Sequence, residues 1–145
     1  MKLEIGQFIR LKDGFNDILG IGKIGFIANY GIVTINFKDK KLGVAIENIK
    51  KVSFDIIDLL EEGDLVGIEY YSPQSEERVT RLFEVDYKYG KSMNLMNSHF
   101  QFLVLDGKFL KSEEFEPIIR TVTTKEQIEQ ISYRVGEEIW KNFYC

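Results

Sequence analysis

The sequence predicts a mainly β (α+β) protein with two strand-rich lobes and a C-terminal helix. Three observations carry this prediction: short apolar runs between glycine-containing turns over residues 1–53, longer alternating runs in the middle of the chain, and a helix-spaced apolar pattern after residue 124. Of the 145 residues, 44% are hydrophobic and 29% charged, which excludes disorder, collagen and coiled coil. We expect lobes over residues 1–53 and 54–145, or one compact unit.

The first lobe contains four short strand patterns separated by turns, over residues 6–12, 22–29, 31–38 and 42–46. The segment Glu47–Val52 then reads as a tight helical turn that leads into a final short strand. Four or five strands within about fifty residues, with glycine at the corners, predict a small twisted β-barrel. The order of these patterns, ending in Asn48–Val52, is similar to the SH3-like barrels, including their Tudor and KOW relatives.

The second lobe begins with Asp55–Gly63, where a two-turn helix capped by Asp55 and an extended segment both fit the pattern. Strands are expected over residues 64–71, 78–89, 100–105, 108–111 and 118–122, with a β-bulge at Arg81–Leu82. Asp106–Gly107 supplies the two positive-φ positions of a type I′ hairpin. Gly6–Ile9 and Gly63–Val66 open the two lobes in a similar way, which suggests two related barrel-like lobes.

A helix is predicted after Thr124. Thr124–Gln127 matches a capping box, and an apolar stripe at spacings of three and four follows at Ile128, Ile131 and Val135. A second stripe, which either docks on the core or forms an oligomer contact, consists of Ile139, Trp140, Phe143 and Tyr144. No apolar run approaches about 20 residues and charges interrupt the N-terminus, so we expect no membrane span, no signal peptide and a cytoplasmic location.

Reactive side chains are scarce. The chain has one histidine, His99, and one cysteine, Cys145, which excludes a disulfide framework, a cysteine-based zinc site and sites with two histidine ligands. Gly20–Gly25 satisfies G-x-G-x-x-G, but a strand pattern follows it where a dinucleotide site needs a helix, so barrel corners explain these glycines better. We expect no catalytic residues, metal or cofactor, and an enzyme with a pocket beside His99 is the third alternative.

Charge divides the chain into a basic and an acidic part. Residues 1–53 carry a net charge of +4, whereas residues 54–145 carry −8. A basic set that could track nucleic-acid phosphates, with aromatic rings for stacking, comprises Lys38, Lys40, Lys41, Lys50 and Lys51 with Phe37 and Tyr30. An acidic set comprises Glu61, Glu62, Asp64, Glu76 and Glu77, with Glu113, Glu114 and Glu116 further on; solvated faces explain it better than metal binding, and a phosphate-imitating surface stays open.

Three segments resemble small accessory proteins encoded by phages and prophages of low-GC Gram-positive bacteria: Ile56–Val66 (IIDLLEEGDLV), Ile118–Glu129 (IIRTVTTKEQIE) and Ser132–Gly136 (SYRVG). The opening strand Gly6–Gly14 is also similar, whereas Gly67–Glu69 departs from their pattern. Most such proteins have no assigned activity, and the resemblance implies a setting in which short acidic proteins bind and inhibit host factors, anti-CRISPR and other counter-defence proteins among them.

We therefore expect a non-enzymatic phage-encoded protein that occupies a host protein, for example a nucleic-acid-binding defence effector, as a counter-defence inhibitor such as an anti-CRISPR does. The alternative is a nucleic-acid-binding SH3-like module that uses the basic first lobe.

Overall fold

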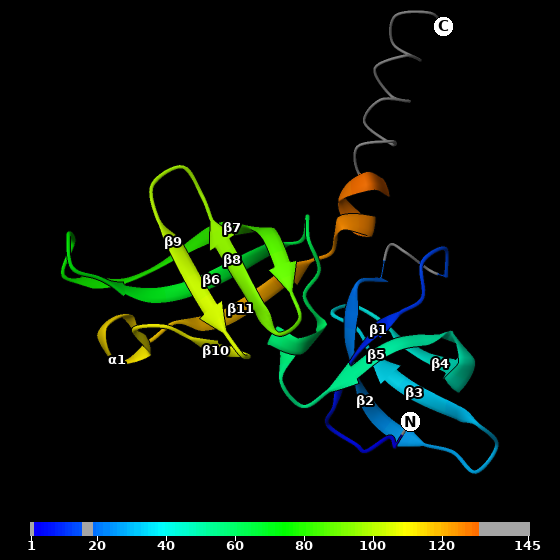
Figure 1. Cartoon of the computed structure of the whole chain (residues 1–145). Helices are drawn as coiled ribbons and strands as arrows, with labels where there is room; N and C mark the ends of the chain where they lie inside the picture. Colours follow the sequence, from blue (N-terminus) through cyan, green and yellow to red (C-terminus); the bar gives the residue numbers. More distant parts are fainter. Residues whose placement is uncertain (1, 16–18, 131–145) are drawn as a thin grey trace, which may run out of the picture. The chain divides into compact units, whose positions relative to one another are not determined.

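The computed structural model of the chain describes residues 2–15 and 19–130, and its fold is mainly β, as the sequence predicts. The chain divides into two compact units, each built on one antiparallel sheet (Figure 1). The first unit is Met1–Val52 together with Lys125–Cys145, and the second is Ser53–Thr124.

The first unit is a five-stranded sheet with the strand order β4-β3-β2-β1-β5, and it curls into a half-barrel (Figure 1). Its elements are β1 (Phe8–Leu11), β2 (Ile21–Ile27), β3 (Ile32–Asn36), β4 (Lys41–Ala45), the single 3₁₀ turn η2 (Ile46–Asn48) and β5 (Ile49–Ser53). Alternate residues of these strands point inward and form a core of Ile9, Leu11, Ile24, Val33, Ile35, Phe37, Val44 and Ile49. The four predicted strand patterns and the helical turn before the last strand are confirmed.

The second unit is a six-stranded sheet with the order β10-β9-β8-β7-β6-β11. Its elements are the 3₁₀ helix η3 (Ile56–Leu59), β6 (Leu65–Ser72), β7 (Glu77–Tyr89), β8 (Ser92–Met96), β9 (Gln101–Leu105), β10 (Lys108–Phe109), α1 (Ser112–Phe115) and β11 (Ile118–Thr123). One face of the sheet carries the core. Aromatic rings dominate it: Phe102 packs against Tyr70, Phe83, Phe100, Phe109 and Phe115, with ring centroids 4.9–5.9 Å apart.

Two predictions for the second unit concern local signals, and one is confirmed fully and the other in part. The Asp106–Gly107 hairpin forms with φ of 50° and 81°, as a type I′ turn requires. Asp55 caps a helix, because its carboxylate accepts the Ile57 N–H at 3.1 Å, but the helix is a single 3₁₀ turn and not two α-helical turns.

Two features of the second unit differ from the prediction. The β-bulge lies between Val85 and Tyr87 and not at Arg81–Leu82, because Leu82 keeps its regular place opposite Gly67. The strand expected over residues 108–111 ends at Phe109, and the chain turns into α1. Neither α1 nor the strand β8 was expected, since both are short and lie among polar residues.

The helix after Thr124 is confirmed over residues 125–130. The predicted lobe boundaries place it in the second lobe, but it groups with the first unit. There Glu126 forms an ion pair with Arg10 at 2.8 Å, and Gly20 lies against the end of the Gln127 side chain. Of the first expected stripe only Ile128 is described; the rest of it, the whole second stripe and Cys145 lie outside the described residues.

Both units repeat one five-stranded plan. β1, β2, β3, β4 and β5 occupy the same order as β6, β7, β8, β9 and β11. The registers match too: Ile24 pairs with Ile35 just before a bulge in the first unit, and Val85 pairs with Leu95 just before a bulge in the second. The two units therefore share one strand order, and only the first is curled into a half-barrel.

The turn that opens each unit is the closest point of similarity. In the first, Gly6 (φ 94°) donates its N–H to the Ile24 carbonyl at 2.9 Å, Gln7 accepts the Ile24 N–H on its carbonyl, and the Gln7 side chain accepts the Glu4 N–H at 2.7 Å. The left-handed φ explains the glycine, and the side-chain acceptor satisfies a donor that the turn leaves open.

The second unit makes the same bonds with different side chains. Gly63 (φ 91°) donates to the Val85 carbonyl at 2.9 Å, and Asp64 accepts the Val85 N–H on its carbonyl. The Asp64 carboxylate accepts the Glu61 N–H at 2.8 Å, in place of the Gln7 amide. Glutamine and aspartate are thus exchangeable here because each supplies one acceptor oxygen.

The units differ mainly in the connection between their fourth and fifth strands. In the first unit this connection is η2 alone, the three residues Ile46–Asn48. In the second it is residues 106–117, which contain β10 and α1 and are called the insertion below.

Candidate binding surfaces

The predicted basic set is divided by the sheet. Lys38, Lys40 and Lys41 lie exposed at the turn between β3 and β4, whereas Lys50 and Lys51 lie on β5, at the opposite edge of the strand order. Lys50 forms an ion pair with Asp13 at 3.4 Å. The strand order does not bring these five lysines together as one surface.

Phe37 cannot serve as a stacking platform, so this part of the prediction is wrong. Its side chain is 8% exposed and belongs to the core of the first unit, because it follows the inward-facing Val33 and Ile35 at the same spacing of two. Tyr30 is 89% exposed, but it lies at the other end of β3 from the lysine turn. Five strand residues separate these two ends by about 16 Å.

The predicted acidic set also separates. Asp64 and Glu61 are 0% and 8% exposed, because they build the buried opening turn of the second unit, so the expectation of a solvated face is wrong for both. Glu62 is exposed and accepts the Lys88 N–H at 3.0 Å. Glu76 and Glu77 lie exposed at the turn between β6 and β7, at the other end of β7 from Lys88.

The outer face of the six-stranded sheet, opposite its core, carries large apolar side chains. Across three strands Tyr87 lies opposite Asn94, and Asn94 lies opposite Leu103. Exposed apolar side chains on this face include Leu82 (60%), Tyr87 (58%), Met96 (36%), Leu103 (42%) and Leu105 (54%), and we call these five the outer apolar surface. A sheet with one face on a core normally presents polar residues on the other.

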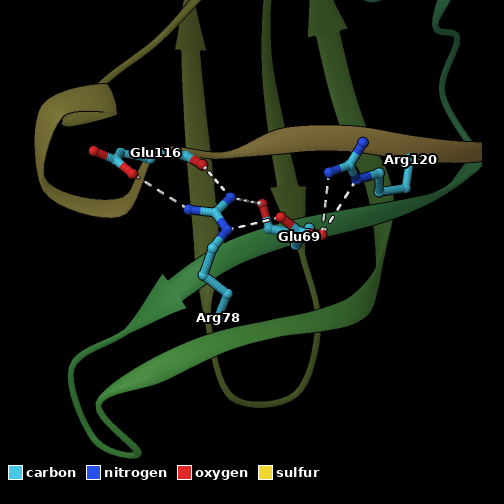
Figure 2. A network of polar contacts seen from close by, with 4 residues as sticks. All are labelled: Glu69, Arg78, Glu116 and Arg120. Atoms are coloured by element: carbon cyan, nitrogen blue, oxygen red, sulfur yellow. Dashed lines mark hydrogen bonds and ion pairs between the residues drawn. The ribbon is translucent and has the colours of Figure 1, made fainter.

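An ion-pair network lies at the β6–β11 side of the same outer face (Figure 2). Glu69 on β6 receives Arg78 Nε at 2.7 Å and Arg120 Nη2 at 3.2 Å. Arg78 also donates to the carbonyl of Glu116 at 2.8 Å, and its Nη1 lies 3.4 Å from the Glu116 carboxylate. The hydrogen bond from Arg78 and the positive charge of Arg120 hold the pKa of Glu69 below its usual value. The network therefore ties β7, β6, β11 and the end of the insertion together.

His99 lies exposed in the loop before β9, beside an open depression lined by Met96, Asn97 and Gln101. Its backbone N–H bonds to Asn97 Oδ1 at 2.9 Å, and no described residue contacts its imidazole by a hydrogen bond. A general base needs an orienting partner, and the described part of the chain provides none to His99.

Within residues 2–15 and 19–130, no three His, Cys, Asp or Glu side chains gather closely enough to hold a metal ion. None of the helices in this part of the chain has the length and apolar character needed to cross a membrane.

Sequence reasoning missed the outer apolar surface. Its signal in the sequence is a strand with apolar residues at both odd and even positions. β9 reads Gln-Phe-Leu-Val-Leu, where Phe102 and Val104 enter the core and Leu103 and Leu105 face outward. Such a run predicts a strand without saying which face is covered.

Comparisons of the chain with protein-family models, with curated proteins and with solved structures find no match.

Proposed function

We propose that this chain is a non-enzymatic protein-binding module whose outer apolar surface contacts a partner protein. One observation carries the proposal: five large apolar side chains, 36–60% exposed, share one face of a sheet whose other face already covers a core. Contiguous exposed apolar patches mark interaction sites, and Tyr and Met are enriched at interfaces. The resemblance to phage and prophage accessory proteins favours a host protein as the partner, with counter-defence inhibition of the anti-CRISPR kind, in the host cytoplasm, as the biological role.

Affinity capture with matched variants tests this proposal. The tagged chain and its Leu82→Ser/Tyr87→Ser variant are incubated with nuclease-treated lysate of a Gram-positive host. We expect the parent chain to retain one stoichiometric protein and the variant to lose it. A Glu76→Gln/Glu77→Gln variant, changed at exposed positions away from this surface, serves as the control and should retain the protein. Equal retention by the two variants, or no stoichiometric protein at all, contradicts the proposal.

The second candidate is a nucleic-acid-binding SH3-like module in the first unit. Two observations favour it: the order β4-β3-β2-β1-β5 with a 3₁₀ turn before the last strand is similar to the SH3-like barrels, and Lys38, Lys40 and Lys41 are exposed together at one turn. Three phosphate contacts to duplex DNA predict a slope of about −2.7 in log K against log salt concentration. A Lys38→Gln/Lys40→Gln/Lys41→Gln variant should abolish that slope; absence of binding at low salt contradicts this candidate.

A further inference from the structure

The insertion builds a hollow against the end of β9. The hollow has a volume of about 240 Å³, and its walls include Phe100, Phe102, Leu110, Lys111 and Phe115. Phe100 and Phe115 lie 5.2 Å apart between ring centroids and form an aromatic wall. The volume is below the roughly 300–1,000 Å³ of small-molecule pockets, so the hollow suits a single apolar side chain.

The backbone of β9 is open beside this hollow. β10 pairs with β9 only at Leu105 and Val104. The last hydrogen bond along this edge of β9 is the one that the Leu110 N–H donates to the Leu103 carbonyl at 2.9 Å. Backbone groups of alternate strand residues point to the same side, so the N–H and C=O of Gln101 point the same way as those of Leu103. Because the Asn97 N–H bonds to the Phe100 carbonyl, the backbone of Phe100 faces β8 and that of Gln101 faces away from it. Neither group has a hydrogen-bond partner among the described residues. An exposed strand edge of this kind accepts another strand.

The insertion is held at both of its ends. At the first, Ser92 Oγ accepts the Asp106 N–H at 3.1 Å and the Lys91 carbonyl accepts the Gly107 N–H at 2.8 Å. At the second, Arg78 binds both the carbonyl and the carboxylate of Glu116 (Figure 2). A wall held in this way is formed before any ligand arrives, which reduces the ordering cost of binding.

Lys111 gives the hollow its charge. It is the one charged side chain among the lining residues, it is exposed, and it makes no ion pair with any described residue. Its backbone has a φ of 57°, an uncommon conformation for lysine, which directs the chain from β10 into α1. A carboxylate next to the hollow would complement this ammonium group.

We propose that the hollow binds an extended peptide segment of a partner protein. The segment adds to the edge of β9, where its carbonyl accepts the Gln101 N–H and its N–H donates to the Gln101 carbonyl. An apolar side chain of the segment fills the hollow, and a neighbouring carboxylate pairs with Lys111. This inference rests on the proposed protein-binding function and locates a second contact, distinct from the outer apolar surface. The first unit has no counterpart, since η2 takes the place of the insertion.

A random peptide library displayed on phage, selected against the immobilised full chain, tests this inference. We expect recovered peptides to share one large apolar residue next to an aspartate or glutamate. Binding of the synthesised peptides is then measured by fluorescence anisotropy. Lys111→Asn, which removes the charge but suits the left-handed backbone, should weaken binding about tenfold, and Lys111→Arg should stay within about twofold. Gln101→Pro removes the outward N–H without breaking a bond to β8 and should also weaken binding about tenfold.

The outcomes separate this inference from the proposed function. Failure to enrich any peptide, or equal binding to the parent and Lys111→Asn chains, overturns the peptide site. Peptides that lose binding to Tyr87→Ser but keep it to Lys111→Asn also overturn it, while they leave the outer apolar surface as the contact. Because Gln101→Pro can disturb the sheet, its circular dichroism spectrum is compared with that of the parent chain, and Lys111→Asn decides alone if the spectra differ.

Discussion

The turns Glu4–Gln7 and Glu61–Asp64 make the same hydrogen bonds, and each leads into the same order of five strands, yet the units built on them differ in surface and content. Residues at equivalent positions in the two units show how their surfaces differ. Lys23 of the first unit pairs with Phe8, where Glu84 of the second pairs with Leu65.

Some surface properties are nevertheless shared. Phe26 and Tyr87 hold equivalent positions after the bulge and are 60% and 58% exposed. Both units thus present an aromatic ring at one outward position, and the residue three positions earlier on the same strand is basic in the first unit (Lys23) and acidic in the second (Glu84). The shared plan forms the sheet, whereas the charges and the insertion distinguish what each unit can bind.

The largest expected difference between the units lies in their cores. Phe102 and Leu42 hold equivalent positions, opposite Leu95 and Ile35, but Phe102 is 2% exposed within an aromatic cluster and Leu42 is half-buried. Phe102→Ala should cost about 3–5 kcal/mol of unfolding free energy in the second unit. Leu42→Ala should cost less than about 2 kcal/mol in the first. Native-state hydrogen exchange reports each unit separately, and equal losses would contradict the comparison.

The opening turns of the two units should differ less in how much they contribute to the unfolding free energy. Asp64 is fully buried and its acceptor is charged, so Asp64→Ala should cost about 1.5–3 kcal/mol, against about 0.5–1.5 kcal/mol for Gln7→Ala with its neutral amide. Urea denaturation followed by circular dichroism measures both. Asp64→Asn keeps an acceptor oxygen and serves as the matched control; a loss as large as that of Asp64→Ala would mean that the hydrogen bond is not what stabilises the turn.

The Glu69 network makes the second unit more sensitive to acid. Arg78 and Arg120 lower the pKa of Glu69 in the folded chain, so the stabilisation is present above the pKa of unfolded glutamate and is lost as the pH falls through the lower folded value. The difference in thermal midpoint between the parent and Glu69→Gln should therefore be largest near pH 7 and shrink towards about pH 3. Glu77→Gln, at an exposed position outside the network, should show a smaller difference at every pH; a constant Glu69→Gln difference contradicts this prediction.

The smallest effect is expected at the exposed aromatic rings. Phe26→Ser and Tyr87→Ser should each change the unfolding free energy by no more than about 0.5 kcal/mol, because neither ring belongs to a core. If Tyr87→Ser reduces partner retention and Phe26→Ser does not, the two units differ in function at an equivalent position. A large stability loss in Tyr87→Ser would instead indicate that this ring supports the fold.

Local signals predicted the turns well because their causes are local. The Asp106–Gly107 hairpin and the similar openings at Gly6 and Gly63 follow from the positive φ that a few residue types adopt. The bulge between Val85 and Tyr87 was placed wrongly, since a bulge depends on which partner residue each strand residue meets. α1 was missed because the backbone geometry of Lys111 and Glu116, at φ of 57° and 45°, has no sequence signature.

The candidate sites were harder to predict than the fold. Phe37, Glu61 and Asp64 lie near charged residues in the sequence, yet Phe37 continues the inward alternation of Val33 and Ile35, and Glu61 and Asp64 lie buried in the opening turn of the second unit. The five lysines are close in sequence and are divided by the order of the strands.

By itself the sequence determined the mainly β class, the strand-rich character of both halves, the hairpin and the helix after Thr124, since alternation and turn chemistry act over a few residues. Only the tertiary structure decided that Leu103 and Tyr87 share an exposed face, and that the insertion forms a hollow beside an open strand edge. These features depend on strand pairing between distant segments, which no local pattern encodes.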